Sequence, residues 1–463
     1  MNDLSKHYIE NITFDELTIG QSARQVRTLA LEDIQAFAAV SGDLNPTHVD
    51  ADFARLFQGV TAHGMWGGTL VSSLLGTELP GPGTVYVEQS LQFLLPVHVG
   101  DTLTVSATVL AKDAATKRVT LACAASNQHG AQVLSGTAVV LAPLVRIRRL
   151  ALQLQPMHMF DPQARLRQLL AQVRHLAPVR CAVVHPCDEE SLRGALEAAA
   201  HGVIEPLLIG PEARLRALAE QGGMDLHGVA IRAALHSVDA AEQAVALAAS
   251  GQVGAIMKGS LHTDELMHAV MAERALRSGR RLSHVFRFDV PRYDKPLLLT
   301  DAALNIRPGL EDKADIVQNA ILLAHALGLE LPDVAILAAV ETVNVHMQST
   351  LDAAALCKMA DRGQIRGARL DGPLAFDNAV SMEAARIKGI ASDVAGHADI
   401  LVVPDLESGN MLAKQLEYLA GATTCGVVLG ARVPIALTSR ADGPDARVGS
   451  AVLALLVARQ ERP

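Results

Sequence analysis

A chain of 463 residues is too long for one hydrophobic core of ordinary size, so its length predicts two or three domains. Gly, Ser, Thr or charged residues interrupt every apolar segment before the roughly 20 residues that cross a bilayer, and no secretory signal is recognisable, so we expect no membrane partner and a cytoplasmic location. A formal net charge of -9 and an aromatic content of only 3% argue against nucleic acid as a partner.

Residues 1–145 contain one helix candidate followed by four segments with strand character. The helix candidate, residues 62–79, is rich in small residues, which would let strands pack closely against it: Gly64, Gly67, Gly68, Ser72 and Ser73. In the later segments β-branched residues alternate with polar ones between turn signals, at residues 84–96, 101–113, 117–128 and 131–143. This order predicts an α+β domain, an antiparallel sheet around one buried helix.

The pattern of apolar residues changes after residues 146–175, a segment that mixes basic residues, Pro and amphipathic sequence. We place a linker there, between a first domain at 1–145 and a second at 176–463. Short apolar runs such as RCAVVH, GAIMKGS and DILVVPD then alternate with helical segments. Strands that alternate with helices predict an α/β domain with a mostly parallel sheet, in which ligands bind beyond the carboxyl ends of the strands.

The first cluster of polar residues is the sequence SGDLNPTH. Asp43 and His48 flank Asn45-Pro46, a pair that favours a turn and can direct both side chains to one point. A carboxylate and an imidazole around one water can add that water across a double bond. The alternative is an Asx-turn that caps a helix near Ala51 to Leu56, with His48 merely packed.

The segment from Thr28 to Asp101, including SGDLNPTH and AHGM, resembles the (R)-specific enoyl-CoA hydratases of the MaoC-like hot-dog family. The resemblance implies that Asp43 and His48 are the catalytic pair. It also implies that Gly64 offers its backbone N–H to the thioester carbonyl, at a helix N-terminus where an enolate oxygen develops. His63 is a second candidate base from its position alone. We interpret four neighbouring residues as structural: His63, Tyr86, Glu88 and Gln89.

Two strand ends of the second domain carry polar groups. The strand DILVV leads to Asp405, and a helix opens across Gly409–Asn410, a junction suited to an anion. Lys414 falls about one turn inside that helix, so we expect these four residues to bind substrate; the alternative is an ordinary N-cap with a solvated lysine. The strand VPIALT ends at Ser439 and Arg440, and the fork of an arginine matches phosphate oxygens.

Three segments, VGAIMKGSLHTDEL, VVPDLESGNMLAKQLEYLAGA and ALTSRADG, resemble the phosphate acetyltransferase and phosphate butyryltransferase family, whose members exchange an acyl group between CoA and inorganic phosphate. The likeness implies that Arg440 binds the phosphoryl group and that Ser439 hydrogen-bonds the carbonyl as it becomes tetrahedral. It also implies an aspartate that takes the proton of the CoA thiol. In the acetyl branch that register falls on Ala446, whereas SRAD is closer to the butyryl branch, so Asp442 is the first candidate and Asp445 the second.

Two functions remain open. The chain is either a bifunctional enzyme that hydrates trans-2-enoyl-CoA to (R)-3-hydroxyacyl-CoA and transfers acyl groups between CoA and phosphate, or a hydratase with a non-catalytic acyl-CoA-sensing or oligomerisation module. A related domain appended to malic enzymes is thought to serve in the second way. His268, where the acetyl branch carries a phosphate-binding Arg, leaves room for it. The transacylase fold is isocitrate dehydrogenase-like, but no matching metal-binding Asp set is present.

The expected ligands follow from these resemblances. CoA and inorganic phosphate or acyl phosphate enter as substrates, with no tightly bound cofactor. The five cysteines are scattered without a CxxC pair, so we expect reduced thiols and no metal. Both families usually pair subunits to complete their sites, which implies a homodimer or a higher homo-oligomer. The acyl chain length has no readable code in an apolar pocket wall.

Overall fold

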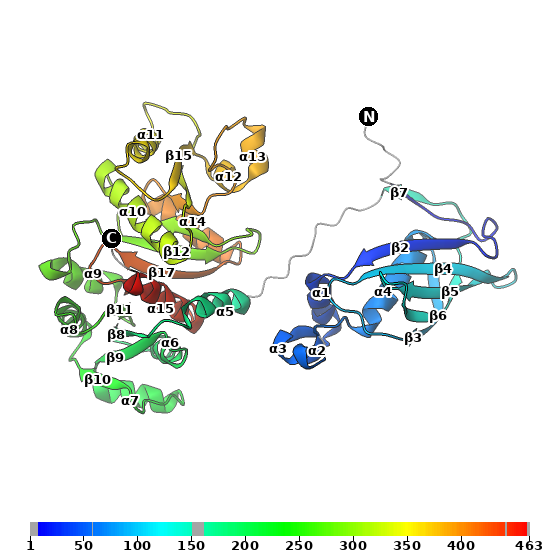
Figure 1. Cartoon of the computed structure of the whole chain (residues 1–463), viewed down its shortest axis with the longest axis horizontal. Coiled ribbons are helices and arrows are strands. Elements are labelled where there is room, and N and C mark those ends of the chain that lie inside the picture. Colours follow the sequence, from blue (N-terminus) through cyan, green and yellow to red (C-terminus); the bar gives the residue numbers. More distant parts are fainter. Residues whose placement is uncertain (1–7, 58, 151–161, 440–441, 461–463) are drawn as a thin grey trace. The chain divides into compact units, whose positions relative to one another are not determined.

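The computed structural model describes residues 8–57, 59–150, 162–439 and 442–460. The chain divides into two compact units, Met1–Met159 and Phe160–Pro463 (Figure 1). The division falls inside the segment 146–175. That segment also holds a strand of the first unit, β7 (Arg148–Leu150), and a helix of the second, α5 (Pro162–Val173).

The N-terminal unit is an antiparallel sheet wrapped around one helix, α4 (Gly64–Thr77). The sheet has the spatial order β2-β4-β5-β6-β3, with β2 (Ser22–Thr28), β4 (Thr102–Asp113), β5 (Arg118–Ser126), β6 (Gln132–Leu141) and β3 (Val85–Phe93). Alternate residues of β4 and β5 are buried, because side chains of a strand point to opposite faces and one face packs on the helix. The predicted hot-dog fold is confirmed.

Small residues set how closely these layers approach. A Cβ atom added to Gly68 of α4 would lie 3.0 Å from the Leu91 side chain of β3. A Cβ atom at Gly136 of β6 would lie only 1.9 Å from the backbone oxygen of Ser90, so no side chain fits there. The glycines of the helix and sheet therefore allow the contact that the small-residue pattern predicts.

A connecting segment of short helices joins β2 to α4 and contains the SGDLNPTH sequence. Its elements are α1 (Leu31–Ser41), α2 (Pro46–Val49), α3 (Ala51–Ala54) and the 3-10 helix η2 (Arg55–Phe57). Near the ends of the unit, β1 (Tyr8–Glu10) pairs with β7 in an antiparallel ribbon.

The C-terminal unit is built on one large sheet with the order β10-β9-β8-β11-β18-β17-β12-β13-β16-β14-β15. Its strands are β8 (Val179–Val184), β9 (Ile204–Gly210), β10 (Ala230–Ala233), β11 (Ala255–Lys258), β12 (Ser283–Asp289), β13 (Leu297–Thr300), β14 (Asp333–Leu337), β15 (Arg369–Leu374), β16 (Ile400–Val402), β17 (Thr423–Leu429) and β18 (Ile435–Ala436). Seven of the ten neighbouring pairs are parallel, which confirms the predicted mostly parallel sheet.

The three antiparallel pairs lie side by side in the middle, between β18 and β17, β17 and β12, and β12 and β13. Three reversals in succession make the strands from β13 to β15 run opposite to the strands from β10 to β18. The carboxyl ends of these two blocks therefore lie at opposite edges of the sheet. This reversal decides which of the predicted site residues can meet.

Helices surround the sheet, and α15 (Pro444–Arg459) is buried along almost its whole length. The others are α6 (Glu189–Ala200), α7 (Glu212–Gln221), α8 (Ser237–Ala249), α9 (Thr263–Ala272), η3 (Arg274–Leu276), α10 (Leu310–Ala326), α11 (Gln348–Asp361), α12 (Phe376–Val380), α13 (Met382–Ile387) and α14 (Leu406–Tyr418). None of the helices in the described part of the chain is long and apolar enough to cross a membrane.

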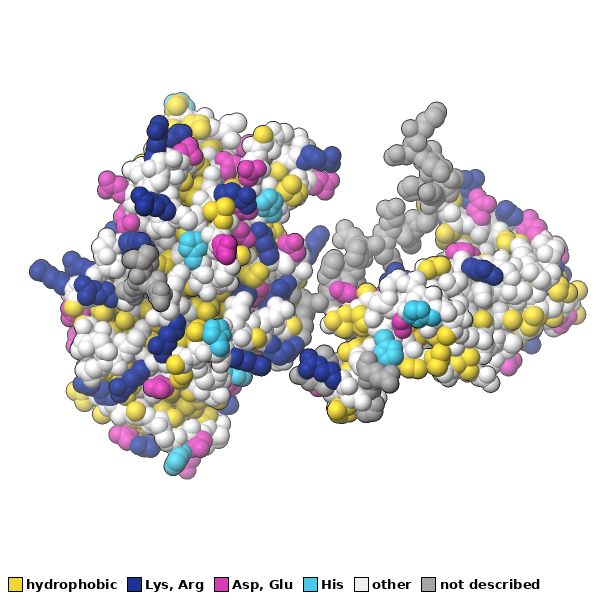
Figure 2. Space-filling view, viewed as in Figure 1, with side chains coloured by type: hydrophobic (Ala, Val, Ile, Leu, Met, Phe, Trp, Pro, Cys, Tyr) yellow, Lys and Arg dark blue, Asp and Glu magenta, His cyan; other side chains and the backbone are white. Residues whose placement is uncertain are grey.

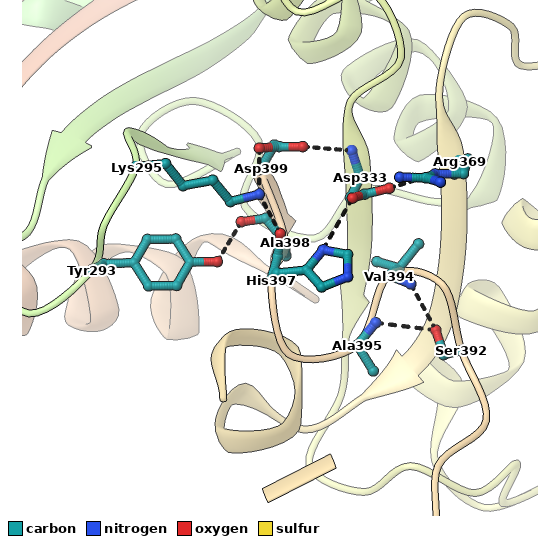
Figure 3. Close-up of polar contacts among 10 residues, drawn as sticks. All are labelled: Tyr293, Lys295, Asp333, Arg369, Ser392, Val394, Ala395, His397, Ala398 and Asp399. Atoms are coloured by element: carbon teal, nitrogen blue, oxygen red, sulfur yellow. Dashed lines mark hydrogen bonds and ion pairs between the residues drawn. The ribbon is translucent and has the colours of Figure 1, made fainter. Parts of the chain in front are cut away.

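A polar network joins the amino ends of β13, β14 and β16 (Figure 3). The Asp399 carboxylate accepts from Lys295 Nζ at 2.6 Å and from the Asp333 backbone N–H at 2.8 Å. The Asp333 carboxylate in turn accepts from Arg369 Nε at 2.7 Å and lies 3.1 Å from His397 Nδ1. Two buried carboxylates thus tie four neighbouring segments together, which fixes the sheet edge.

Candidate functional sites

The turn that carries the first predicted pair is shaped by its backbone. Helix α1 ends at Gly42, whose φ of 74° is the left-handed conformation that favours glycine. Asn45 caps α2 by accepting from the Thr47 backbone N–H at 3.2 Å, and Pro46 opens that helix. The alternative interpretation placed a cap on the helix near residues 51–56, and there Asp50 accepts from the Phe53 backbone N–H at 3.1 Å, ahead of which Asn45 caps α2. Asp43 accepts from the Asn45 N–H at 3.2 Å, and its side chain is exposed.

His48 is held in one tautomer. Its Nδ1 lies 2.7 Å from the backbone oxygen of Thr61. A carbonyl oxygen can only accept, so Nδ1 carries the hydrogen and Nε2 keeps a lone pair. The imidazole is therefore oriented as a base whose free nitrogen is Nε2.

His63 connects this turn to α4. It is 3% exposed, precedes the first residue of α4, and its Nε2 lies 3.0 Å from the Asp43 backbone oxygen, to which it donates. Its ring stacks on the His48 ring with 3.9 Å between centroids. The polar side-chain atoms of Asp43, His48 and His63 lie within 4.8 Å of one another. The sequence-predicted pair thus converges, with His63 as a positioning residue between them.

Gly64 begins α4, so its N–H belongs to the first turn of the helix, where backbone donors have no intrahelical partner. A cavity of about 240 Å³ opens beside it, and its walls are mainly apolar. The lining residues are Ala62, His63, Gly64, Trp66, Gly67, Phe93, Leu94, Leu95, Pro96, Val97, Leu103, Val133 and Leu134. The cavity can take an acyl chain whose carbonyl faces the helix N-terminus.

In the C-terminal unit the second predicted cluster lies just beyond β18. The Asp442 carboxylate accepts from the Ser439 backbone N–H at 2.7 Å. Asp442 is 8% exposed, and burial raises the pKa of its carboxyl group. Ser439 is exposed, whereas Arg440 lies outside the described residues. A buried carboxylate with a raised pKa holds a proton more strongly than an exposed one, which suits a proton acceptor.

Two buried cations, not assigned a role from the sequence, hold the backbone beside Ser439. Arg447 in the first turns of α15 is fully buried and donates to Thr438 Oγ1 at 3.0 Å and to the Ser439 oxygen at 3.4 Å. Lys258, at the end of β11, donates to the Thr438 oxygen at 3.4 Å. Burial lowers the pKa of Arg447, but its charge persists because arginine titrates far above neutral pH. Buried cations facing one strand end favour anions there.

A cavity of about 250 Å³ lies against this strand end. Both candidate bases, Asp442 and Asp445, line it, as does Ala446. A buried ion pair between Arg287 and Asp289 forms another part of the wall. The remaining lining residues are Leu166, Leu169, Glu417, Ala422, Thr423, Thr424, Cys425, Gly443 and Gly449.

The strand reversal separates the PDLESGN junction from Ser439. Asp405 follows β16, whose carboxyl end lies at the opposite sheet edge from that of β18. The Asp405 side chain caps α14 by accepting from the Ser408 N–H at 2.8 Å, as the N-cap alternative predicts. A Cβ atom at Gly409 would lie 2.6 Å from the Val403 side chain, so this glycine permits close packing.

The other end of α14 does reach the Ser439 edge. Glu417, near its C-terminus, lines the cavity beside Asp442, and Lys414 forms an ion pair with Glu417 at 2.7 Å. Asn410, by contrast, donates to the Ala302 oxygen at 3.3 Å, close to the start of the helix. Of the four residues predicted to bind substrate, the structure brings only Lys414 toward the aspartates.

Comparisons with known proteins match both units. The family model "Phosphate acetyl/butaryl transferase" matches residues 229–455, and a MaoC-like domain model matches residues 16–129. The chain is 58% identical to the phosphate acetyltransferase of Rhizobium meliloti over 296 residues, which are 64% of this chain and 94% of the relative.

Solved structures match the two units separately. A branched-chain phosphotransacylase from Enterococcus faecalis V583 is similar to 61% of this chain and is covered completely, with 29% identity and a TM-score of 0.54. The R-hydratase PhaJ1 from Pseudomonas aeruginosa is 42% identical, with 33% of this chain and 99% of that chain covered and a TM-score of 0.32.

Proposed function

Because the chain belongs to the phosphate acetyl/butyryl transferase family and carries a MaoC-like domain ahead of the transferase domain, we propose that it is a bifunctional acyl-CoA enzyme. The N-terminal unit hydrates trans-2-enoyl-CoA to (R)-3-hydroxyacyl-CoA. The C-terminal unit transfers an acyl group between CoA and inorganic phosphate, both of which are substrates. Acetyl is the first acyl group to test, because the 58% identical relative is a phosphate acetyltransferase.

The hydration step is supported chiefly by the fixed tautomer of His48. Its Nε2 removes a proton from water, and the hydroxide oxygen bonds to C3 of the enoyl group. The electrons of the double bond move to the thioester oxygen, where the N–H of Gly64 at the start of α4 stabilises the enolate. The proton that His48 removed then passes to C2 through Asp43, so that both residues return to their starting state.

Acyl transfer is supported chiefly by the buried Asp442 carboxylate next to Ser439. Asp442 removes the proton of the CoA thiol, and the thiolate attacks the carbonyl carbon of an acyl phosphate. Ser439 donates to the carbonyl oxygen while that carbon is tetrahedral. Phosphate then leaves with the electrons of the C–O bond, and Arg440 together with the field of the buried cations Lys258 and Arg447 favours the anion.

One observation favours a non-catalytic role for the second unit. Ala446 lines the cavity at the register where the acetyl branch carries its aspartate, and an alanine cannot accept a proton. In that case the second unit binds acyl-CoA as a sensor or joins subunits. Binding of acetyl-CoA without CoA release in phosphate distinguishes this function from acyl transfer.

We also propose that the chain forms at least a homodimer. Strand β3 is the last strand in the order of the N-terminal sheet, and its exposed side chains include Val85, Val87 and Phe93. An apolar edge strand is a template for pairing with a second copy. Analytical ultracentrifugation tests this, and a monomer at micromolar concentration would contradict it.

Two assays on the whole chain test the bifunctional proposal. Loss of crotonyl-CoA absorbance reports hydration, and CoA release from acetyl-CoA in phosphate reports transfer. His48→Gln is expected to abolish only the first, and Asp442→Asn only the second. If one substitution abolishes both activities while the thermal unfolding profile is unchanged, the two sites are not independent and the assignment is wrong.

A further inference from the structure

A third cavity, of about 660 Å³, lies at the opposite end of α15 from Asp442. Its walls come from the turn between β17 and β18, the loop that precedes β12, α10 and the segment that follows α11. The size is within the range of small-molecule sites. Nothing in the proposed hydratase or transferase chemistry uses this cavity.

The cavity is strongly basic. Four arginines line it from three separate segments: Arg277, Arg280, Arg366 and Arg432. No Asp or Glu is among the described lining residues, although the chain as a whole has a formal net charge of -9. Within the part of the chain that the structure describes, Arg277, Arg280 and Arg366 form no ion pair with a carboxylate.

Figure 2 shows Lys and Arg side chains on the face of the C-terminal unit that is in view. The guanidinium groups of Arg277, Arg280 and Arg366 lie around one hollow without a carboxylate partner and repel one another, and an anion bound among them relieves that repulsion.

Backbone contacts hold the arginine-bearing segments in place. Arg277 and Ala431 form an isolated antiparallel bridge, and Ser278 Oγ donates to the Gly430 oxygen at 2.5 Å. The backbone of Arg366 exchanges two hydrogen bonds with the side chain of Gln318 on α10, at 3.0 and 3.1 Å. The guanidinium groups therefore project from fixed segments, which lowers the entropy lost when they bind a ligand.

We propose that this cavity binds a small molecule that carries a diphosphate or triphosphate group, of which a nucleotide is the expected form. Arginine forks pair with phosphate oxygens through two parallel hydrogen bonds, and four forks exceed the need of a single phosphate. Apolar wall residues can pack against a base: Leu322, Leu429, Pro434 and Val457.

The site is separate from the proposed transferase site. Ala446 in the first turn of α15 lines the cavity of Asp442, whereas Val457 near its end lines the arginine cavity. Eleven residues of helix separate them, a distance of about 16 Å. One phosphate chain cannot contact both sites at once.

Isothermal titration of the whole chain with ADP, ATP and pyrophosphate at low salt tests the proposal. In the double variant Arg280→Ser/Arg366→Ser we expect binding to weaken about 100-fold, since each charged contact is worth about tenfold. Arg362→Ser, which removes an exposed arginine beside the same segment but outside the cavity, should change binding less than twofold. Both arginines of the double variant are exposed, so its unfolding temperature should match that of the control.

The same titrations, with CoA added as a fourth ligand, identify the source of the phosphates. Binding of ATP or ADP at least tenfold tighter than that of pyrophosphate shows that the apolar wall takes a base. Loss of both CoA and ADP binding in the double variant identifies the diphosphate of CoA as a source. Absence of binding of all three probes at millimolar concentration overturns the proposal. It is also overturned if the double variant binds them like the wild type, or if Asp442→Asn rather than the double variant abolishes binding.

Discussion

Replacement of Asp442 with Asn tests the proton acceptor and the folding energetics together. The Asn side-chain oxygen can still accept from the Ser439 N–H that Asp442 accepts at 2.7 Å, so the loop should keep its shape. The variant cannot remove the proton of the CoA thiol. General base catalysis contributes about 10² to 10⁴-fold, so CoA release from acetyl-CoA in phosphate should slow by that factor. This corresponds to about 3–5 kcal/mol of activation free energy.

The same substitution should not lower stability at neutral pH. Burial raises the pKa of Asp442 in the folded state above its unfolded value. Below the unfolded pKa the carboxyl group is protonated in both states, and stability is lost as the pH rises through the folded pKa. Asn carries no charge, so the variant should unfold at a higher temperature than the wild type at pH 7 to 8. The difference should shrink toward pH 4.

Asp445→Asn is the matched control, because Asp445 lines the same cavity but is exposed. It should retain transfer activity within a few-fold and show no pH-dependent gain in unfolding temperature. If Asp442→Asn keeps more than a tenth of the wild-type turnover while Asp445→Asn is inactive, the roles are reversed. If Asp442→Asn is inactive and also unfolds more easily at pH 8, the reasoning from burial is refuted.

Three further substitutions probe other parts of the chain. His48→Gln should reduce crotonyl-CoA hydration at least about 100-fold and leave CoA release unchanged, because the oriented Nε2 base is lost. Gly409→Ala should lower the free energy of unfolding by about 1–3 kcal/mol in urea titrations, because the new Cβ would lie 2.6 Å from Val403. An unchanged free energy of unfolding together with lost acyl transfer would instead favour a role for Gly409 in binding substrate. Asp399→Ala should lower the free energy of unfolding by about 1–3 kcal/mol, because Lys295 loses its carboxylate partner. An unchanged midpoint of urea unfolding would contradict this prediction.

The fold could be predicted because its signals are local. Alternation with period two identifies the strands around α4, and apolar runs between helical segments identify the βαβ pattern of the second unit. The meeting of Asp43 and His48 was also predictable, since a short Asn-Pro turn lies between them. These features depend on neighbours within a few residues.

The placement of Asp405 was not predictable in the same way. It depends on three antiparallel pairs in the middle of the sheet, and strands β12 and β17 are mostly buried on both faces, as parallel strands are. Strand direction is a property of pairing across the whole unit. Arg447 was missed for a related reason, because a lone arginine in a helix is normally solvated, and only the packing of α15 against α6 reveals that it is buried.

In both proposed sites a backbone group orients the acid or base, a feature that a comparison of side chains in the sequence does not reveal. His48 is oriented by the backbone oxygen of Thr61, and Asp442 by the backbone N–H of Ser439. A backbone partner is present whatever side chain the residue carries, so Thr61→Val should leave the His48 tautomer, and therefore hydration, nearly unchanged. The geometry of each acid or base then depends on the path of the chain, which the core of each unit fixes. Near Thr61 and Ser439, we therefore expect two kinds of substitution to differ. Those that shift the backbone should impair catalysis more than those that change a side chain and leave the backbone in place.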